Sequence, residues 1–132
     1  MKDDDNALIE AAKAVRARAH APYSHYYVGS AVLDEKGRIH SGCNVENAAY
    51  PEGICAETGA IAAMVAAGGT RIVAIAAVGG RHELEACTPC GGCRQRILEF
   101  ADGNTRIILL DDKGQPRRCT IDELLPASFR LL

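Results

Sequence analysis

Three cysteines and one glutamate stand in two short stretches of the sequence, with a spacing that could build a metal site. Cys55 precedes Glu57 by two residues, and Cys90 and Cys93 follow later as a Cys-x-x-Cys pair. Thiolates are preferred zinc ligands, and a catalytic zinc typically has three protein ligands and one open position. A turn can bring Cys90 and Cys93 to one metal, so we expect these two residues and Cys55 to bind zinc.

The spacing leaves other interpretations open. Cys87, Cys90 and Cys93 form two overlapping Cys-x-x-Cys pairs, which could close a structural four-cysteine site with Cys55 or act as a redox dithiol. Glu57 favours the open site, because a carboxylate in the first turn of a helix could take a proton from water that zinc acidifies. A glutamate is also favoured at a helix N-terminus for electrostatic reasons alone.

Composition narrows the class of protein. The 132 residues are 48% hydrophobic and 24% charged, which predicts one globular domain over residues 1–132. A net charge of −2 predicts no binding of nucleic-acid polymers. We find neither an apolar run of about 18 residues nor a signal peptide, so we expect a cytoplasmic protein without membrane contact. Reduced thiols are expected there, and Cys43 and Cys119 are interpreted as small hydrophobic residues in or near the core.

Hydrophobic periodicity predicts an α/β sandwich with a mixed sheet and helices on both faces. Residues 3–5 are interpreted as a frayed end or as charges at the start of a helix. The expected elements are a helix from Asn6 to about His20, a hairpin of strands 26–33 and 38–45, a buried helix from Cys55 to about Ala67, a buried strand 71–78, a helix from Cys90 to near Phe100, a strand 105–110 and a short helix 121–125.

Several separated motifs resemble the short, homotetrameric, zinc-dependent type of cytidine deaminase, in that family's order and over nearly the whole chain. The matching segments are residues 21–29, 42–48, Cys55-Ala56-Glu57, residues 89–95 and residues 124–129. The resemblance implies a three-layer α-β-α sandwich with a mixed five-stranded sheet. It also implies hydrolytic deamination of cytidine and 2′-deoxycytidine to uridine and 2′-deoxyuridine, with release of ammonia, as part of pyrimidine salvage.

The resemblance also assigns roles to residues. One Zn²⁺ per subunit would be held by Cys55, Cys90 and Cys93, and Glu57 would shuttle protons between water, the pyrimidine N3 and the departing amine. The expected substrate-binding residues are Asn44 and Glu46 at the sugar, Tyr26 at the pocket wall, Ala56 and the Cys90 backbone at the base, and Tyr50 and Phe129 at an interface between subunits of a homotetramer.

Other interpretations of these residues are retained. Tyr26 and Phe129 could be core residues, Asn44 could belong to a turn, and Glu46 could be a solvated charge. The function could instead be deamination of a related aminopyrimidine nucleoside of the blasticidin type. A non-catalytic structural zinc protein is the alternative from a different class, and it predicts Cys87 as a fourth ligand.

One position departs from the family pattern. Where the family usually has an arginine that hydrogen-bonds the ligand thiolates, this chain has Thr58, followed by Gly59. We hypothesise that Arg94 and the two helix N-termini take up the missing charge compensation. Gly59 inside a helix could reflect close packing against a neighbouring subunit.

Overall fold

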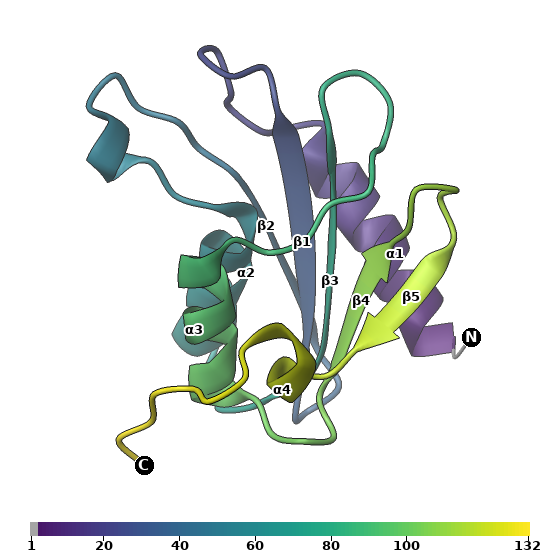
Figure 1. The fold of residues 1–132 in the computed structure, drawn as a ribbon, viewed down its shortest axis with the longest axis vertical. Helices are drawn as coiled ribbons and strands as arrows, with labels where there is room; N and C mark the ends of the chain where they lie inside the picture. Colours follow the sequence, from purple (N-terminus) through teal and green to yellow (C-terminus); the bar gives the residue numbers. More distant parts are fainter. Residues whose placement is uncertain (1–2) are drawn as a thin grey trace.

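The computed structural model describes residues 3–132, which form a five-stranded sheet covered by helices on both faces (Figure 1). This arrangement confirms the predicted α-β-α sandwich. The elements in chain order are α1 (Asp3–Arg16), β1 (Tyr27–Asp34), β2 (Ile39–Cys43), the 3₁₀ helix η1 (Tyr50–Glu52), α2 (Ala56–Ala66), β3 (Ile72–Gly80), α3 (Gly91–Phe100), β4 (Arg106–Leu110), β5 (Pro116–Cys119) and α4 (Ile121–Leu124).

The sheet is mixed, with the strand order β2-β1-β3-β4-β5. β1 lies antiparallel to both β2 and β3, β3 and β4 are parallel, and β5 is antiparallel to β4. A parallel pair needs a crossover connection, which here contains α3. No helix within residues 3–132 is long and apolar enough to cross a membrane.

Alternate side chains of the strands build two separate cores. On the α1 face, Ala31 of β1 and Ala76 of β3 pack with Leu8 and Ala12 of the helix. On the other face, Val32 and Ile75 pack with residues of α2 and α3 such as Met64 and Ile97. This alternation is the period-two pattern of strands, and it fixes α2 and α3 on one side of the sheet.

The first helix corrects the expected boundaries. It spans Asp3–Arg16, whereas the sequence predicted a helix from Asn6 to about His20 with residues 3–5 as a frayed or merely charged start. Asp5 is fully buried and accepts hydrogen bonds from Arg106 of β4 at 3.0 Å and from Arg118 of β5 at 2.8 Å. Ion pairing with two strands extends the helix over this acidic start.

Two glycines lie where α2 packs against β2, and one of them, Gly42, sets the close approach. A Cβ on Gly42 would lie 2.3 Å from the backbone nitrogen of Ala60, so only glycine fits at that position of β2. A Cβ on Gly59 would meet Gly42 Cα at 3.5 Å, which is an ordinary contact. Gly59 therefore faces β2 of its own subunit, and a packing contact with another subunit is not needed to place it.

These distances predict opposite effects of two alanine substitutions. Gly42→Ala forces the helix from the sheet and should destabilise the protein by about 1–3 kcal/mol, the usual range for overpacking. Gly59→Ala has room and should stabilise it by up to about 1 kcal/mol through helix propensity. Denaturant unfolding at one protein concentration measures both. Destabilisation by Gly59→Ala would contradict the assignment and indicate that another surface packs there.

Candidate active site

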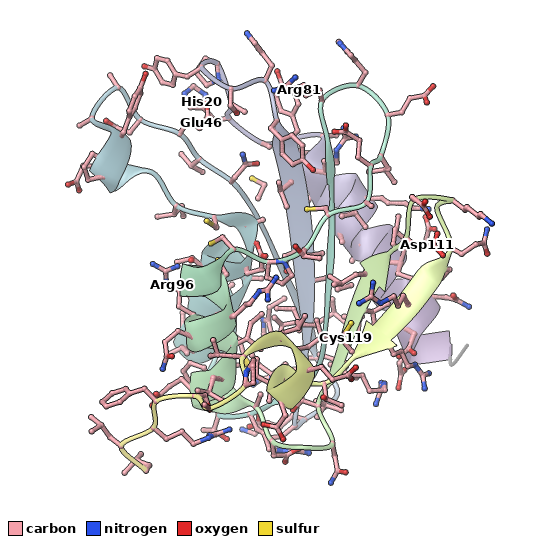
Figure 2. The ribbon with its side chains drawn as sticks, in the orientation of Figure 1. His20, Glu46, Arg81, Arg96, Asp111 and Cys119 are labelled. Atoms are coloured by element: carbon pink, nitrogen blue, oxygen red, sulfur yellow. The ribbon has the colours of Figure 1, made fainter. Side chains whose placement is uncertain are left out.

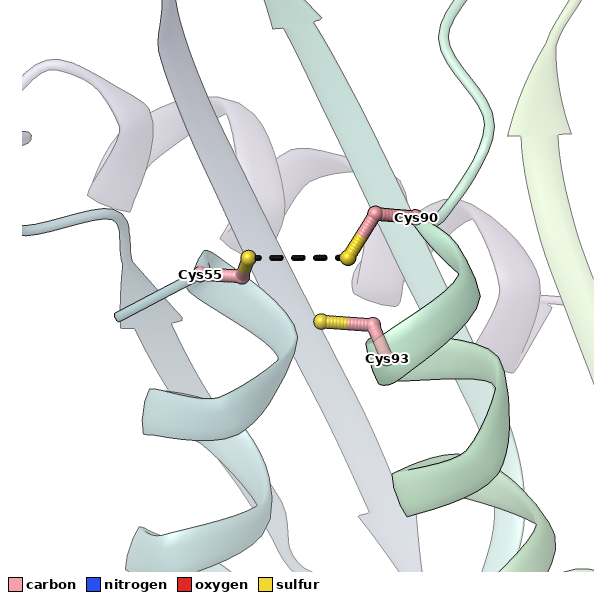
Figure 3. A group of neighbouring side chains, drawn as sticks. All are labelled: Cys55, Cys90 and Cys93. Atoms are coloured by element: carbon pink, nitrogen blue, oxygen red, sulfur yellow. Dashed lines mark hydrogen bonds between the residues drawn. The ribbon is translucent and has the colours of Figure 1, made fainter. Parts of the chain in front are cut away.

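The starts of two helices bring the predicted zinc ligands together. Cys55 is the N-cap of α2, Cys90 is the N-cap of α3, and Cys93 lies in the first turn of α3. Figure 3 shows the two helices side by side with the three sulfurs between their N-terminal ends. Both helix dipoles therefore direct their positive ends toward the sulfurs, which favours thiolates.

The spacing of the sulfurs fits a tetrahedral metal. The Sγ atoms of Cys55 and Cys90 are 3.7 Å apart, and all three sulfurs lie within 4.8 Å of one another. Ligands about 2.3 Å from zinc at tetrahedral angles would be separated by about 3.8 Å. The donor set of three thiols fits zinc, and the exposure of Cys90 opens the site on one side.

The three thiols are electrostatically coupled. The contact between the Cys55 and Cys93 sulfurs lowers the pKa of Cys55, whereas the same contact, together with burial, raises the pKa of Cys93 far above its ordinary value. One thiolate therefore forms at the expense of its neighbour. A cation between the sulfurs removes this competition, as metal ligation requires deprotonated thiols.

Cys87 does not join the ligand group. Among residues 3–132, the cluster that could hold a metal contains Cys55, Cys90 and Cys93. The Cys87 sulfur lies beside the ring of Tyr26, since both would be 3.1 Å from a Cβ placed on Gly79. Burial raises the pKa of Cys87, and burial with the neighbouring Cys87 raises the pKa of Tyr26 to about 12. This geometry disfavours the closed four-cysteine site.

Glu57 lies in the first turn of α2, directly after the Cys55 cap, and only 4% of its surface is exposed. Burial raises the pKa of its carboxyl, against the opposing influence of its own backbone N–H and of the Arg96 charge. A glutamate placed only to favour the helix start would remain solvated. A buried carboxylate near the sulfurs is suited to proton transfer, because a raised pKa makes both protonation states accessible.

The surroundings of Cys93 differ from the sequence-based hypothesis. Arg94 donates to the carbonyl oxygens of Pro89 and Leu124, both at 2.8 Å, and so joins backbone segments. Thr58 Oγ1 lies 3.9 Å from Cys93 Sγ, and Arg96 Nη1 donates to the same sulfur at 3.7 Å. Arg96 was missed, although its place three residues after Cys93 in a predicted helix puts both on one face.

Asn44 and Glu46 both contact the segment before and at the start of β1. The Asn44 amide accepts from the Val28 N–H and donates to the Tyr26 carbonyl, each at 2.8 Å. Glu46 accepts from the backbone N–H groups of Tyr23 at 3.0 Å and Ser24 at 3.1 Å, and from the Ser24 hydroxyl. Hydrogen bonds from Ser24 are the main reason that the pKa of Glu46 is lowered.

A pocket of about 390 Å³ lies beside these residues, lined by Tyr23, Ser24, Glu46, Asn47, Tyr50 and Gly53. It thus includes two of the predicted substrate residues, Glu46 and Tyr50, and Gly53 is two residues before Cys55. Figure 2 shows Glu46 in the loop region at the end of the sheet where α2 and α3 begin. Most of the surface of this lining is apolar, and Ser24, Glu46 and Asn47 contribute polar groups to it.

The remaining predicted substrate-binding residues lie apart from one another within the chain. Ala56, the first residue of α2, is fully buried, and its N–H is one of the four that an α-helix leaves unpaired at its start. Tyr26 is half-buried beside Cys87. Phe129 is 67% exposed and lies with Leu98 and Glu99 at the other end of α3. The structure therefore does not bring Phe129 to the pocket of its own subunit.

Sequence comparison with known proteins shows the family to which this chain is similar. The model of the cytidine and deoxycytidylate deaminase zinc-binding region matches residues 2–109. A cytidine deaminase of Sporosarcina psychrophila is 40% identical over 126 residues, which cover 96% of this chain and 91% of the relative. One of Mycobacterium tuberculosis is 40% identical over 128 residues, covering 97% and 91%.

Solved structures agree with the sequence comparisons. The crystal structure of cytidine deaminase from Burkholderia pseudomallei has a TM-score of 0.86 and 41% identity, covering 98% of this chain and all of that one. The structure of the Mycobacterium tuberculosis enzyme has a TM-score of 0.82 and 39% identity, again covering 98% of this chain. The predicted fold class is thereby confirmed.

The geometry predicts which cysteines hold zinc. Cys93→Ser removes a buried predicted ligand and should weaken zinc retention by at least about 100-fold. Changes to residues that only contact metal ligands usually weaken it by up to about that factor. Cys87→Ser is the matched control and should keep the wild-type zinc content. Metal analysis after dialysis against a chelator measures both, and loss of zinc from Cys87→Ser would support a closed four-cysteine site instead.

Proposed function

The chain belongs to the cytidine and deoxycytidylate deaminase family, and we propose that it deaminates cytidine and 2′-deoxycytidine hydrolytically, with zinc as cofactor. The observation that carries this proposal is the joint placement of Cys55, Cys90 and Cys93 at two helix starts, with Glu57 buried in the first turn of one of them. Water would replace the 4-amino group, which leaves as ammonia, so that uridine or 2′-deoxyuridine is formed.

Cys55, Cys90 and Cys93 would hold one Zn²⁺ per subunit. The metal supplies a Lewis acid that makes water far more acidic than it is in bulk solution. The protein's part is to keep three thiolates together, for which the N-terminal ends of α2 and α3 provide partial positive charge.

Glu57 is the proposed proton carrier. It can take a proton from the water that attacks C4 and pass it to N3 of the ring. It can then take the proton of the hydroxyl formed at C4 and transfer it to the departing amino group, so that the C4 carbonyl forms as ammonia leaves. One residue suffices because attack at C4 makes N3 basic first and the amino nitrogen basic afterwards. The burial that raises the pKa of Glu57 favours its protonated form between these transfers.

Asn44 and Glu46 are proposed to bind the sugar, with the backbone of Ala56 and Cys90 at the base and Tyr26 at the pocket wall. Carboxylate oxygens carry several lone pairs, so Glu46 can accept from a sugar hydroxyl in addition to its present donors. A ligand without a sugar would leave the polar groups of this site without hydrogen-bond partners, and such a loss discriminates strongly between substrates. Free cytosine should therefore react poorly compared with the nucleoside.

A homotetramer with active sites at subunit interfaces is part of the proposal. Tyr50 is 77% exposed and Phe129 is 67% exposed, although aromatic residues of this size are usually at least partly covered. Phe129 can reach a pocket only in another subunit, where it would stack on the base. We further propose that residues 1–132 form one domain acting in the cytoplasm in pyrimidine salvage, on free nucleosides and not on polynucleotides.

The proton-carrier role predicts a selective loss in one variant. Glu57→Gln keeps the size of the side chain but removes its basicity, so kcat should fall by about 10²–10⁴-fold, the usual contribution of general acid–base catalysis. Ultraviolet monitoring of cytidine loss, with metal analysis in parallel, measures the effect. Zinc content should remain unchanged, and the exposed Glu83→Gln serves as control. Substantial activity of Glu57→Gln would rule out this mechanism.

A further inference from the structure

The buried sulfur of Cys93 has two polar neighbours, Thr58 and Arg96. Thr58 Oγ1 approaches it from α2 at 3.9 Å, and Arg96 Nη1 donates to it from α3 at 3.7 Å. Three thiolates and one Zn²⁺ carry a net charge of −1, which burial makes unfavourable unless a nearby donor offsets it. Threonine offers a neutral hydrogen bond, whereas arginine offers a charged one, which is stronger.

The guanidinium of Arg96, an exposed residue of α3, lies beside the turn that carries Cys90 and Cys93. A Cβ on Gly92 would lie 3.1 Å from Arg96 Nη1 and 3.9 Å from its Cζ. The same Cβ would lie 4.0 Å from Cys90 Sγ. The missing side chain of Gly92 thus leaves the space in which the arginine head rests against the turn that carries Cys90 and Cys93.

Arg96 also lines a groove between α2 and α3. Thr58, Ile61 and Phe100 are among the residues that line this groove with Arg96. A short side chain at position 58 leaves the groove free for a long side chain that enters from α3. Arg94 is not available for this role, because it holds the carbonyl groups of Pro89 and Leu124.

We propose that Arg96 is the positioning residue that compensates the thiolate charge of the metal site, entering from α3 in place of an arginine at position 58 of α2. The inference rests on the proposed function, since it needs zinc on the three cysteines. Arg96 acts through Cys93: its hydrogen bond holds the sulfur in place and stabilises the thiolate form, and it makes no contact with substrate.

The test compares zinc affinity in four variants by competition with a chromogenic chelator. Arg96→Met keeps the apolar stem but removes the charge, and it should bind zinc 10–100-fold more weakly, the usual range for such outer partners. Arg96→Lys keeps a positive charge and should lose less zinc affinity than Arg96→Met. Thr58→Arg added to Arg96→Met should restore the affinity, because it returns a guanidinium to the same sulfur from α2. Arg117→Met, exposed on β5, is the control and should match the wild type.

A second measurement separates charge compensation from folding. Co²⁺ bound in place of zinc gives thiolate-to-metal absorption bands that report the donor strength of the sulfurs. Arg96→Met should shift these bands, and the double variant should return them to the wild-type position, while circular dichroism of all variants stays the same.

The outcomes distinguish this inference from the proposed function. Wild-type zinc affinity and cobalt bands in Arg96→Met would overturn the inference, and so would a loss of affinity that Thr58→Arg does not restore, because the role would then be structural. In both cases a wild-type protein that binds zinc and deaminates cytidine leaves the proposed function intact. A wild-type protein that does neither overturns the function itself.

Discussion

Crowding of three cysteine sulfurs within 4.8 Å is the constraint on which the rest of the structure depends. Thiolates at this distance repel one another, so the fold must supply positive charge from several directions at once. Two helix N-termini do so without any charged side chain, provided that both helices begin at the same point and run side by side. The caps at Cys55 and Cys90 meet this requirement, because each of these two cysteines is also the residue where its helix starts.

The sheet explains why the two helices can begin together. β3 and β4 are parallel, so the chain between them must cross over one face of the sheet, and α3 occupies that crossover. α2 follows the β1–β2 hairpin and packs on the same face, where Ile61 and Ile97 belong to one core. Gly42 lets α2 lie close against β2, which sets the depth of Cys55 relative to the sheet. The position of the first ligand therefore depends on a glycine in a strand that carries no ligand.

Residue patterns predicted much of this fold, and the misses have physical causes. α2, α3 and β3 were predictable because their apolar runs end at glycines or begin at the cysteine motifs. β5 could not be recognised from its residues, because Pro116, Arg117 and Arg118 are exposed on an edge strand with no apolar alternation. The early start of α1 was missed because the buried role of Asp5 depends on arginines about a hundred residues away, a relation that no local pattern contains. Cys119 was correctly interpreted as a core residue.

The site itself shows where local reasoning stops. Residue type and spacing pointed to Cys55, Cys90, Cys93 and Glu57, and the family resemblance selected them from the alternatives. The side chain that contacts the thiolates depends instead on the rotational phase of a helix. Once α3 begins at the Cys90 cap, Cys93 is its third residue, and the side chain three positions later lies on the same face. Arg94, directly after Cys93, points away from that face and donates hydrogen bonds to the carbonyl oxygens of Pro89 and Leu124. Side chains from both helices contact the same sulfur, so an arginine on either helix can lie beside it. The proposed role of Arg96 would make a threonine at position 58 compatible with a balanced metal site.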